Sequence, residues 1–421
     1  MLSSSSRLNV RLLFTPRRPP GAIMLTHLPP LPIVVDYSRA TIKTSKEESR
    51  AAAALRYPDR VRRIAIQGPN LLFDRVYRAM NRPFPTLESF ELNAYGSRFE
   101  VPTIFIRSAP SLRHLRLHNV LFSSLSQLLS STTGLVELDL DIDTVVCLSP
   151  AESLLTHMQG MPCLCRLRLH ASSLTTRISV FNMSAADVVP LPRLTHLQYT
   201  GSTPCFEALA AGLAAPSLRD LEIKLNDHSS TFPHLSRFIE DVEGLFFAVR
   251  VDITSGPPQF SMLTHSHSID EPPRKIAIQN GTTYSVQIGT AFGAKLTTAE
   301  QLFFQRPWTS YMGRDPWFHK DAIAWRELFK QFHNVKILRV GRDLLLDVAR
   351  FLFLNSGGPP VLLPALEEIE LGLAAPALPI SDIEREEVLS NLNVFIAARQ
   401  RVGRPVRISW NADHALPSPY R

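Results

Sequence analysis

Two short pairs of potential metal ligands stand out in the sequence, Cys163-x-Cys165 and His265-Ser-His267. Thiolate sulfur and imidazole nitrogen are the ligands that zinc prefers, but a structural zinc site usually combines two such pairs. Neither pair has a second Cys or His pair nearby at that spacing. We therefore expect the cysteines to pack at the start of a strand and the histidines to meet solvent, and the sequence predicts no metal ion and no cofactor.

Common catalytic motifs are also missing. The chain has no Gly-x-Gly-x-x-Gly, no phosphate-binding Gly-Lys-Ser/Thr, no His-Glu-x-x-His and no Gly-x-Ser-x-Gly, which are patterns tied to cofactor, nucleotide, zinc and acyl-transfer chemistry. We assign no catalytic residue and predict that the protein is not an enzyme. The alternative is a catalytic site within residues 250–325, which would require titratable side chains that hydrogen-bond to one another in a cleft.

Charged and imidazole side chains occupy alternate positions in several short apolar segments. Because successive side chains of a strand point to opposite faces, these residues would share one face of a sheet. Segment by segment they are His114, Arg116 and His118; Glu137, Asp139 and Asp141; Arg166, Arg168 and His170; and His196 and Gln198. An acidic strand would thus lie about 4.8 Å from a basic strand on each side. We expect exposed side chains that contact one another across these strands, specifically Arg116, Glu137, Asp139 and Arg168.

This charge pattern has two interpretations. The strip could dock a partner protein of complementary pattern, or the charges could simply neutralise one another, since an exposed ion pair contributes only about 0 to 1 kcal/mol. Both interpretations disfavour nucleic acid, because Glu137, Asp139 and Asp141 would lie in the middle of any phosphate path.

The elements that would position these side chains follow from a repeated phrase. A hydrophobic residue, two others, a hydrophobic residue, one other and a hydrophobic residue recur six times, starting at intervals of 23 to 30 residues, with first positions at Leu87, Leu112, Leu135, Leu164, Leu194 and Leu218. Five phrases follow Pro-x and the remaining one follows Thr133-Gly134. This period is typical of leucine-rich repeats. We predict an α/β solenoid, or horseshoe, with a parallel concave sheet and convex helices.

The rest of the chain divides around these repeats. We expect an N-terminal capping segment over residues 1–57, regular repeats over 58–250, irregular repeats or an insertion over 251–330, C-terminal repeats and a cap over 331–410, and a frayed tail over 411–421. Helices are expected at 43–55 and 381–401, the second ended by Gly403. Trp308, Trp317 and Trp325 would fill gaps in the irregular region or anchor a partner.

Composition limits the compartment and the partners. The formal charge is +7, from 45 basic and 38 acidic residues. Residues of both signs are scattered along the chain, so the sequence shows no basic stripe of the kind that binds nucleic acid. No apolar run approaches the roughly 18 to 20 residues that a membrane-spanning helix needs, so no membrane partner is expected. Four cysteines are too few for a disulfide framework, which favours a cytoplasmic or nuclear location. The basic residues before position 35 make a mitochondrial location the alternative.

Several phrases together resemble a known family. They are Arg7-Leu-Asn-Val-Arg-Leu12, Leu31-Pro-Ile-Val-Val-Asp-Tyr37, the Pro-x-Leu-x-x-Leu-x-Leu repeats, Asn334-Val-Lys-Ile-Leu-Arg-Val340, Leu362-Leu-Pro-Ala-Leu-Glu-Glu368 and Phe395-Ile-Ala-Ala-Arg-Gln-Arg-Val-Gly-Arg-Pro405. In this order they resemble the fungal F-box-like leucine-rich-repeat proteins. In that family an F-box precedes the first phrase and binds the Skp-type adaptor of a ubiquitin ligase, while the repeats select the substrate.

Only six residues precede Arg7, and an F-box is several times longer, so no Skp-type adaptor is expected to bind this chain. The resemblance then implies a non-catalytic scaffold for protein-protein interaction, similar to the substrate-recognition part of an F-box ubiquitin-ligase subunit. The alternative is a stand-alone leucine-rich-repeat binding protein with no role in ubiquitination. In both cases the predicted concave face would bind a protein.

Overall fold

The computed structural model describes residues 12–15, 31–38, 42, 44–69, 74–95, 99–100, 109–121, 125–141, 154–170, 188–225, 233–241, 246–252, 259–264, 275–280, 296–305, 326, 329–341, 344–354, 362–372 and 382–411. The chain forms two compact units, Met1–Leu218 and Arg219–Arg421, which we describe separately. The predicted positions Cys147, His265 and His267 and the segment from Trp308 to Trp325 lie outside the described residues.

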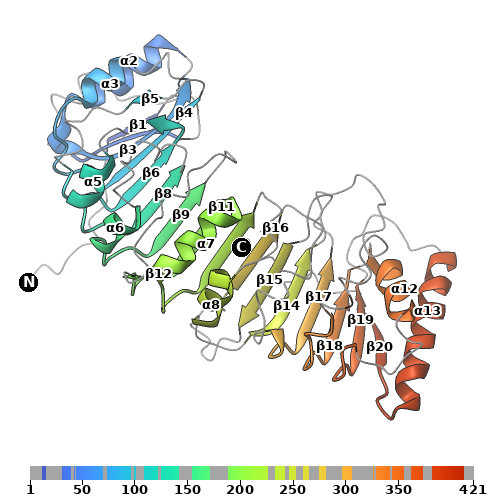
Figure 1. Ribbon diagram of the computed structural model, residues 1–421. Helices are drawn as coiled ribbons and strands as arrows, with labels where there is room; N and C mark the ends of the chain where they lie inside the picture. Colours follow the sequence, from blue (N-terminus) through green and yellow to red (C-terminus); the bar gives the residue numbers. More distant parts are fainter. Residues whose placement is uncertain are drawn as a thin grey trace, which may run out of the picture. The chain divides into compact units, whose positions relative to one another are not determined.

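A parallel sheet forms the first unit (Figure 1). Its neighbouring strands follow chain order: β1 (Leu12–Phe14), β2 (Ile33–Tyr37), β3 (Val61–Pro69), β4 (Ser89–Tyr95), β6 (His114–His118), β8 (Glu137–Asp141), β9 (Arg166–His170) and β11 (His196–Gly201). Each neighbouring pair is parallel. Two short pairs lie apart from this sheet, β5 (Phe99–Glu100) with β7 (Val120–Leu121) and β10 (Val189–Pro190) with β12 (Leu213–Ala214).

Apolar side chains of the repeated phrase stack from strand to strand. Leu115, Leu138, Leu167 and Leu197 are paired in register along β6, β8, β9 and β11 and are all buried. Burial of each such side chain stabilises the fold by roughly 2 kcal/mol. Because no single strand can cover its own leucines, each repeat depends on its neighbours.

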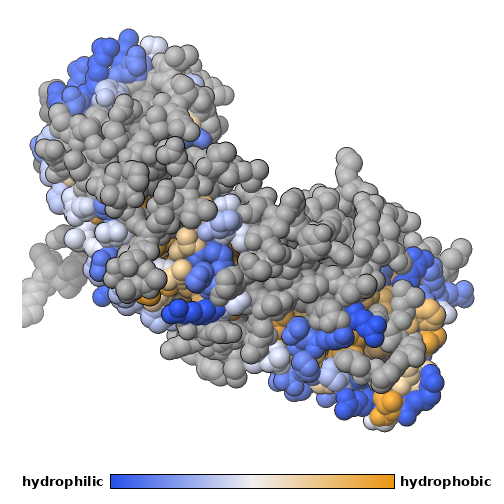
Figure 2. All heavy atoms as spheres, in the orientation of Figure 1, coloured by the Kyte–Doolittle hydropathy of each residue, from blue (hydrophilic) through white to orange (hydrophobic). Residues whose placement is uncertain are grey.

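Helices connect most of these strands. They are α2 (Ser45–Ala54), α3 (Asp74–Met80), α5 (Leu125–Ser131), α6 (Leu154–Gln159) and α7 (Thr203–Gly212), with a 3-10 turn η1 (Pro58–Arg60). The helix expected at 43–55 is confirmed as α2, which begins with a capping box in which Thr44 and Glu47 accept each other's backbone N–H. In Figure 2 the atoms over α2 are hydrophilic, in keeping with the exposed Ser45 and Lys46.

One backbone turn precedes every repeat phrase. The N–H of Leu87 donates to the carbonyl of Phe84, and the same three-residue step ends at Leu112, Leu135, Leu164, Leu194 and Leu218. The proline of Pro-x-Leu therefore occupies the second position of a β-turn, where its fixed φ is favoured. This explains why five of the six phrases begin with Pro-x.

The second unit departs from a purely parallel sheet in the region where irregular repeats or an insertion were expected. Its strand order is β13 (Asp220–Leu225), β16 (Lys275–Asn280), β15 (Gln259–Thr264), β14 (Phe246–Asp252), β17 (Gln301–Gln305), β18 (Ile337–Val340), β19 (Glu368–Gly372) and β20 (Arg407–Asn411). Strands β14, β15 and β16 are antiparallel neighbours, whereas the other pairs are parallel. The links 253–258 and 265–274 are shorter than the dozen or so residues that a parallel crossover needs.

Helices α8 (Pro233–Asp241), α12 (Leu345–Leu354) and α13 (Asp382–Arg401) complete the second unit. The expected helix at 381–401 and its end are confirmed, since Gly403 has a φ of +73° and donates its N–H to the Gln400 carbonyl. Buried Arg399 of α13 donates from Nη2 to the carbonyls of Pro364 and Leu366 in the turn before β19. This arginine ties the last helix to the repeat turn.

Candidate functional site on the polar face of the sheet

The residues that alternate with the hydrophobic residues of the repeat phrase lie on one face of the first unit, which we call the polar face. Asp139 is in register with Arg116 of β6 and Arg168 of β9, and Glu137 is in register with His114 and Arg166. The prediction that the acidic strand lies between two basic strands is therefore confirmed.

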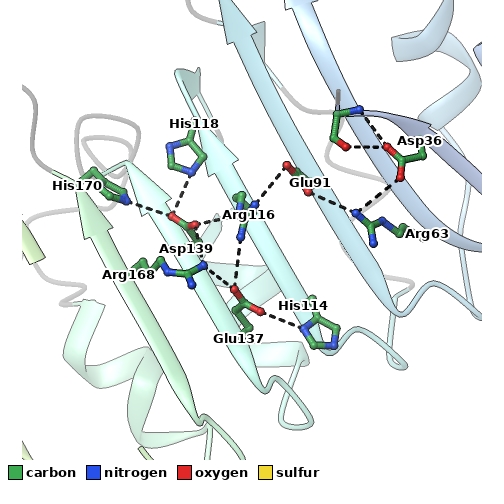
Figure 3. Close-up of polar contacts among 11 residues, drawn as sticks. Asp36, Arg63, Glu91, His114, Arg116, His118, Glu137, Asp139, Arg168 and His170 are labelled. Atoms are coloured by element: carbon green, nitrogen blue, oxygen red, sulfur yellow. Dashed lines mark hydrogen bonds and ion pairs between the residues drawn. The ribbon is translucent and has the colours of Figure 1, made fainter. Parts of the chain in front are cut away.

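Asp139 is the centre of the polar contacts in Figure 3. Its Oδ2 lies 2.9 Å from Arg116 Nε and 3.7 Å from Arg168 Nη1. Its Oδ1 lies 3.1 Å from His118 Nε2 and 3.5 Å from His170 Nε2. Cationic or imidazole groups from both neighbouring strands thus converge on one carboxylate.

Glu137 makes a second set of contacts one pleat away. Arg168 Nη1 lies 2.8 Å from its Oε1 and Arg116 Nη2 lies 3.5 Å from the same oxygen. His114 Nδ1 lies 3.5 Å from Oε2. Both arginines therefore bridge the two carboxylates of β8, and the expected contacts across strands are confirmed.

The expected exposure of the acids was wrong: Glu137 is half-buried, and Asp139 and Asp141 are buried. Asp139 is only 4% exposed and Asp141 only 6%. Asp139 does point to the polar face, but the longer side chains of Arg116, His118, Arg168 and His170 extend over it from both sides. A short carboxylate between two rows of longer arginine and histidine side chains becomes covered by them.

The pKa values in this cluster reflect opposing effects. Burial would raise the pKa of Asp139, but contacts with His118 and His170 and the charge of Arg116 outweigh it and hold that pKa well below its usual range. For Arg116, burial acts to lower the pKa, while the carboxylates of Asp139, Glu91 and Glu137 raise it to a net increase. Both groups are therefore ionised at neutral pH.

The charged row extends over three strands that the sequence prediction did not include. Arg116 Nη1 lies 3.4 Å from Glu91 Oε1 on β4, and Arg63 Nη2 on β3 lies 3.8 Å from Glu91 and 3.9 Å from Asp36 on β2. Glu91 holds the same place in its repeat phrase as Arg116 does in the next, so this signal was present. On β3 the residue in register with Asp36 and Glu91 is the buried Ala65. Arg63 lies two residues before it in the strand.

Cations form the outer layer of this cluster. The side chains of Arg116 and Arg168 are 37% and 33% exposed, whereas those of Glu137 and Asp139 are 16% and 5% exposed. Arg166 and His114 are exposed, and His196 and Gln198 are half-buried on β11. A molecule that approaches the polar face therefore meets guanidinium and imidazole groups before carboxylates.

A smaller version of this pattern occurs in the second unit. Arg339 of β18 donates from Nε and Nη2 to the two carboxylate oxygens of Glu370 on β19, at 2.6 and 3.2 Å, and from Nη1 to Gln301 at 3.2 Å. Its guanidinium carbon lies 5.0 Å from the centre of the Phe303 ring. The strand positions that alternate with the buried hydrophobic residues thus carry paired charges in both units.

The cysteine pair does not assemble a metal site among the described residues. Cys163 and Cys165 are free thiols, and the Cys165 thiol donates a hydrogen bond to the carbonyl oxygen of Cys163 at 3.3 Å. By contrast, ligand atoms of His118, Asp139 and His170 lie within 4.8 Å of one another. No short sequence motif indicates this group, because its members come from three different strands.

No family model and no curated protein matches the chain. Within the described residues, none of the helices combines the length and the apolar character required to cross a membrane.

Proposed function

We propose that the chain is a leucine-rich-repeat solenoid that acts as a non-catalytic scaffold for protein-protein interaction. The repeated β-turn before each phrase supports this assignment, as does the in-register stacking of leucines. A stacked array of repeats presents a broad surface, made of the residues that alternate with the buried hydrophobic ones. Such a surface suits the binding of another protein.

The observation that carries the proposal is the layered charge of the polar face. Arg116 uses all three nitrogens on Glu91, Glu137 and Asp139. Arg168 pairs with Glu137 and Asp139 through Nη1 alone among the described residues. Exposed Arg166 makes no ion pair with a described residue. Arg166 and Arg168 therefore present donors to a partner, and they fit an acidic segment of a protein.

Nucleic acid suits this face less well. Asp36, Glu91, Glu137 and Asp139 supply four carboxylates against the three guanidinium groups of Arg63, Arg116 and Arg168. These ion-paired groups, counted without the exposed Arg166, therefore carry one net negative charge, whereas phosphates gain affinity from a net positive path. A protein carboxylate needs only a local pair of donors.

We test this function with a matched pair of variants in the full chain. The double charge reversal Arg166→Glu and Arg168→Glu alters the polar face, and Arg193→Glu alters an exposed arginine in the turn before β11. Affinity purification from a nuclease-treated lysate, with quantitative mass spectrometry, should recover proteins that are lost with the double variant and kept with Arg193→Glu. Equal recovery with all three chains would contradict the proposal, as would partners that are recovered from an untreated lysate but lost from the nuclease-treated one.

The same purification separates the two roles left open by the sequence. Recovery of a Skp-type adaptor together with the acidic partner would support substrate recognition for a ubiquitin ligase, the role that the family resemblance implies. Recovery of the partner without an adaptor would support a stand-alone binding protein. A direct binding measurement between purified chain and purified adaptor decides whether any recovered adaptor is bound by this chain.

A further inference from the structure

Two histidines and one aspartate on the polar face come close enough to share an ion. His118 Nε2 and His170 Nε2 approach Asp139 Oδ1 to 3.1 and 3.5 Å from strands on opposite sides of β8. Figure 3 shows both imidazole rings turned toward the carboxylate, and their centres are 5.4 Å apart. We propose that His118, Asp139 and His170 form a binding site for a divalent transition-metal ion of the zinc class.

Both nitrogen-oxygen separations agree with metal coordination. Zinc binds imidazole nitrogen and carboxylate oxygen at about 2.1 Å, which places ligand atoms about 3.0 Å apart in an octahedral site and about 3.4 Å apart in a tetrahedral one. The two nitrogen-oxygen distances lie at these values, and all three ligand atoms lie within 4.8 Å. Two imidazoles with one carboxylate is also an established ligand set for such ions.

Hydrogen bonds of good geometry from the described residues do not hold Oδ1 of Asp139. Asp139 is 4% exposed, yet its Oδ1 finds no hydrogen-bond partner of acceptable geometry among the residues that the structure describes. An orphaned buried carboxylate oxygen costs free energy, and a shared cation next to Oδ1 would satisfy it together with both nitrogen lone pairs.

The surroundings favour an ion at this point. Arg116 Nε holds Oδ2 at 2.9 Å, which fixes the carboxylate and leaves Oδ1 for a metal, as the second shell of metal sites commonly does. Two guanidinium groups nearby oppose a cation, but the net negative charge of the cluster and the additional buried Asp141 on the same strand offset them. His118 and His170 are 23% and 30% exposed, so water or a partner side chain can complete the coordination.

Zinc titration of the metal-stripped, tag-free full chain tests the site. Calorimetry should give one Zn²⁺ per chain, and His118→Ala and His170→Ala should each weaken binding by at least about tenfold. His114→Ala is the matched control, because His114 lies on the same face and contacts Glu137 instead. A double variant of His265 and His267 controls for zinc held by those two residues.

Circular dichroism and X-ray absorption distinguish loss of the metal site from loss of the fold. Asp139→Asn removes a charge that pairs with Arg116, so each variant is checked by circular dichroism, and the two histidine variants keep the carboxylate. X-ray absorption of the zinc-loaded chain should show two imidazole ligands. The proposal is overturned if the folded wild-type chain binds no zinc, or if both histidine variants bind it as tightly as the wild type. Partner binding is scored separately, so failure here leaves the proposed scaffold role intact.

Discussion

Arg116 and Asp139 are in register on adjacent parallel strands, and the arginine Nε lies 2.9 Å from a carboxylate oxygen that is almost fully covered. The pair differs from an ordinary surface ion pair because one partner is buried. Removal of the arginine would leave a buried charge with weaker compensation, which costs far more than loss of an exposed pair.

Arg116→Met should therefore destabilise the protein by about 2 to 4 kcal/mol. Arg168, His118 and His170 keep some contact with Asp139 and limit the loss. Arg166→Met is the control, since Arg166 is exposed, and it should change stability by less than about 0.5 kcal/mol. Urea unfolding followed by circular dichroism measures both. Equal stability of the two variants would show that Asp139 does not need its arginine.

The double variant Arg116→Met and Asp139→Leu should be less destabilised than the two single variants added together. A buried ion pair replaced by apolar groups leaves no orphaned charge, whereas each single change does. We expect a coupling free energy of about 1 to 3 kcal/mol in a double-mutant cycle. Simple additivity would argue against a direct interaction between these residues.

Thr133→Pro should stabilise the protein by about 0.4 to 1 kcal/mol, because proline restricts the unfolded chain. Thr133 occupies the turn position that proline holds in the other five repeats, and the turn closes with the same bond, from Leu135 N–H to the Thr132 carbonyl. The reverse change, Pro110→Thr, should lower stability by a similar amount. Thermal unfolding of both variants checks the pair, and destabilisation by Thr133→Pro would mean that this turn differs in backbone conformation.

Tyr37→Phe should protect the protein at high pH. Burial raises the pKa of Tyr37 to about 12; Arg50 opposes this and Glu47 adds to it. Above pH 10 the unfolded chain releases this proton while the folded chain keeps it, so stability is intact below pH 10 and is lost as the pH rises through 12. The wild type should lose up to about 2 kcal/mol more than Tyr37→Phe over this range.

The control for this experiment is Tyr77→Phe, which removes an exposed phenol from α3. At neutral pH Tyr37→Phe should be neutral or slightly stabilising, because none of the described residues forms a hydrogen bond with the buried Tyr37 hydroxyl. Urea midpoints at several pH values compare the three chains. Parallel loss in all of them would show that Tyr37 does not cause the alkaline transition.

The sequence predicted strand positions well because a two-residue alternation leaves little freedom once leucines must be buried. The register of Arg116, Asp139 and Arg168 followed from that constraint alone. Burial of Asp139 did not follow, because it depends on how long side chains from other strands extend. The triad of His118, Asp139 and His170 was hidden for a similar reason: its ligands are adjacent in space and separated by a full repeat in sequence.

The antiparallel strands of the second unit also escaped prediction. A period of two identifies a strand but not the direction of its neighbour, and β14 to β16 reverse the order in which strands are added. The short proline-containing links were the available signal, since they are too short for parallel crossovers.

This reversal has a consequence for folding during synthesis. In the first unit each new strand can pair with the one just made, as when Glu137 joins His114 after 23 residues. Strand β13 must instead wait for β16, because Asp220 pairs with Lys275, 55 residues later. The contact order therefore rises sharply after residue 220, and longer loops close more slowly. The strands of the first unit can therefore be stacked before synthesis is complete. The edge of β13 that pairs with β16 stays unpaired until β14, β15 and β16 have all left the ribosome.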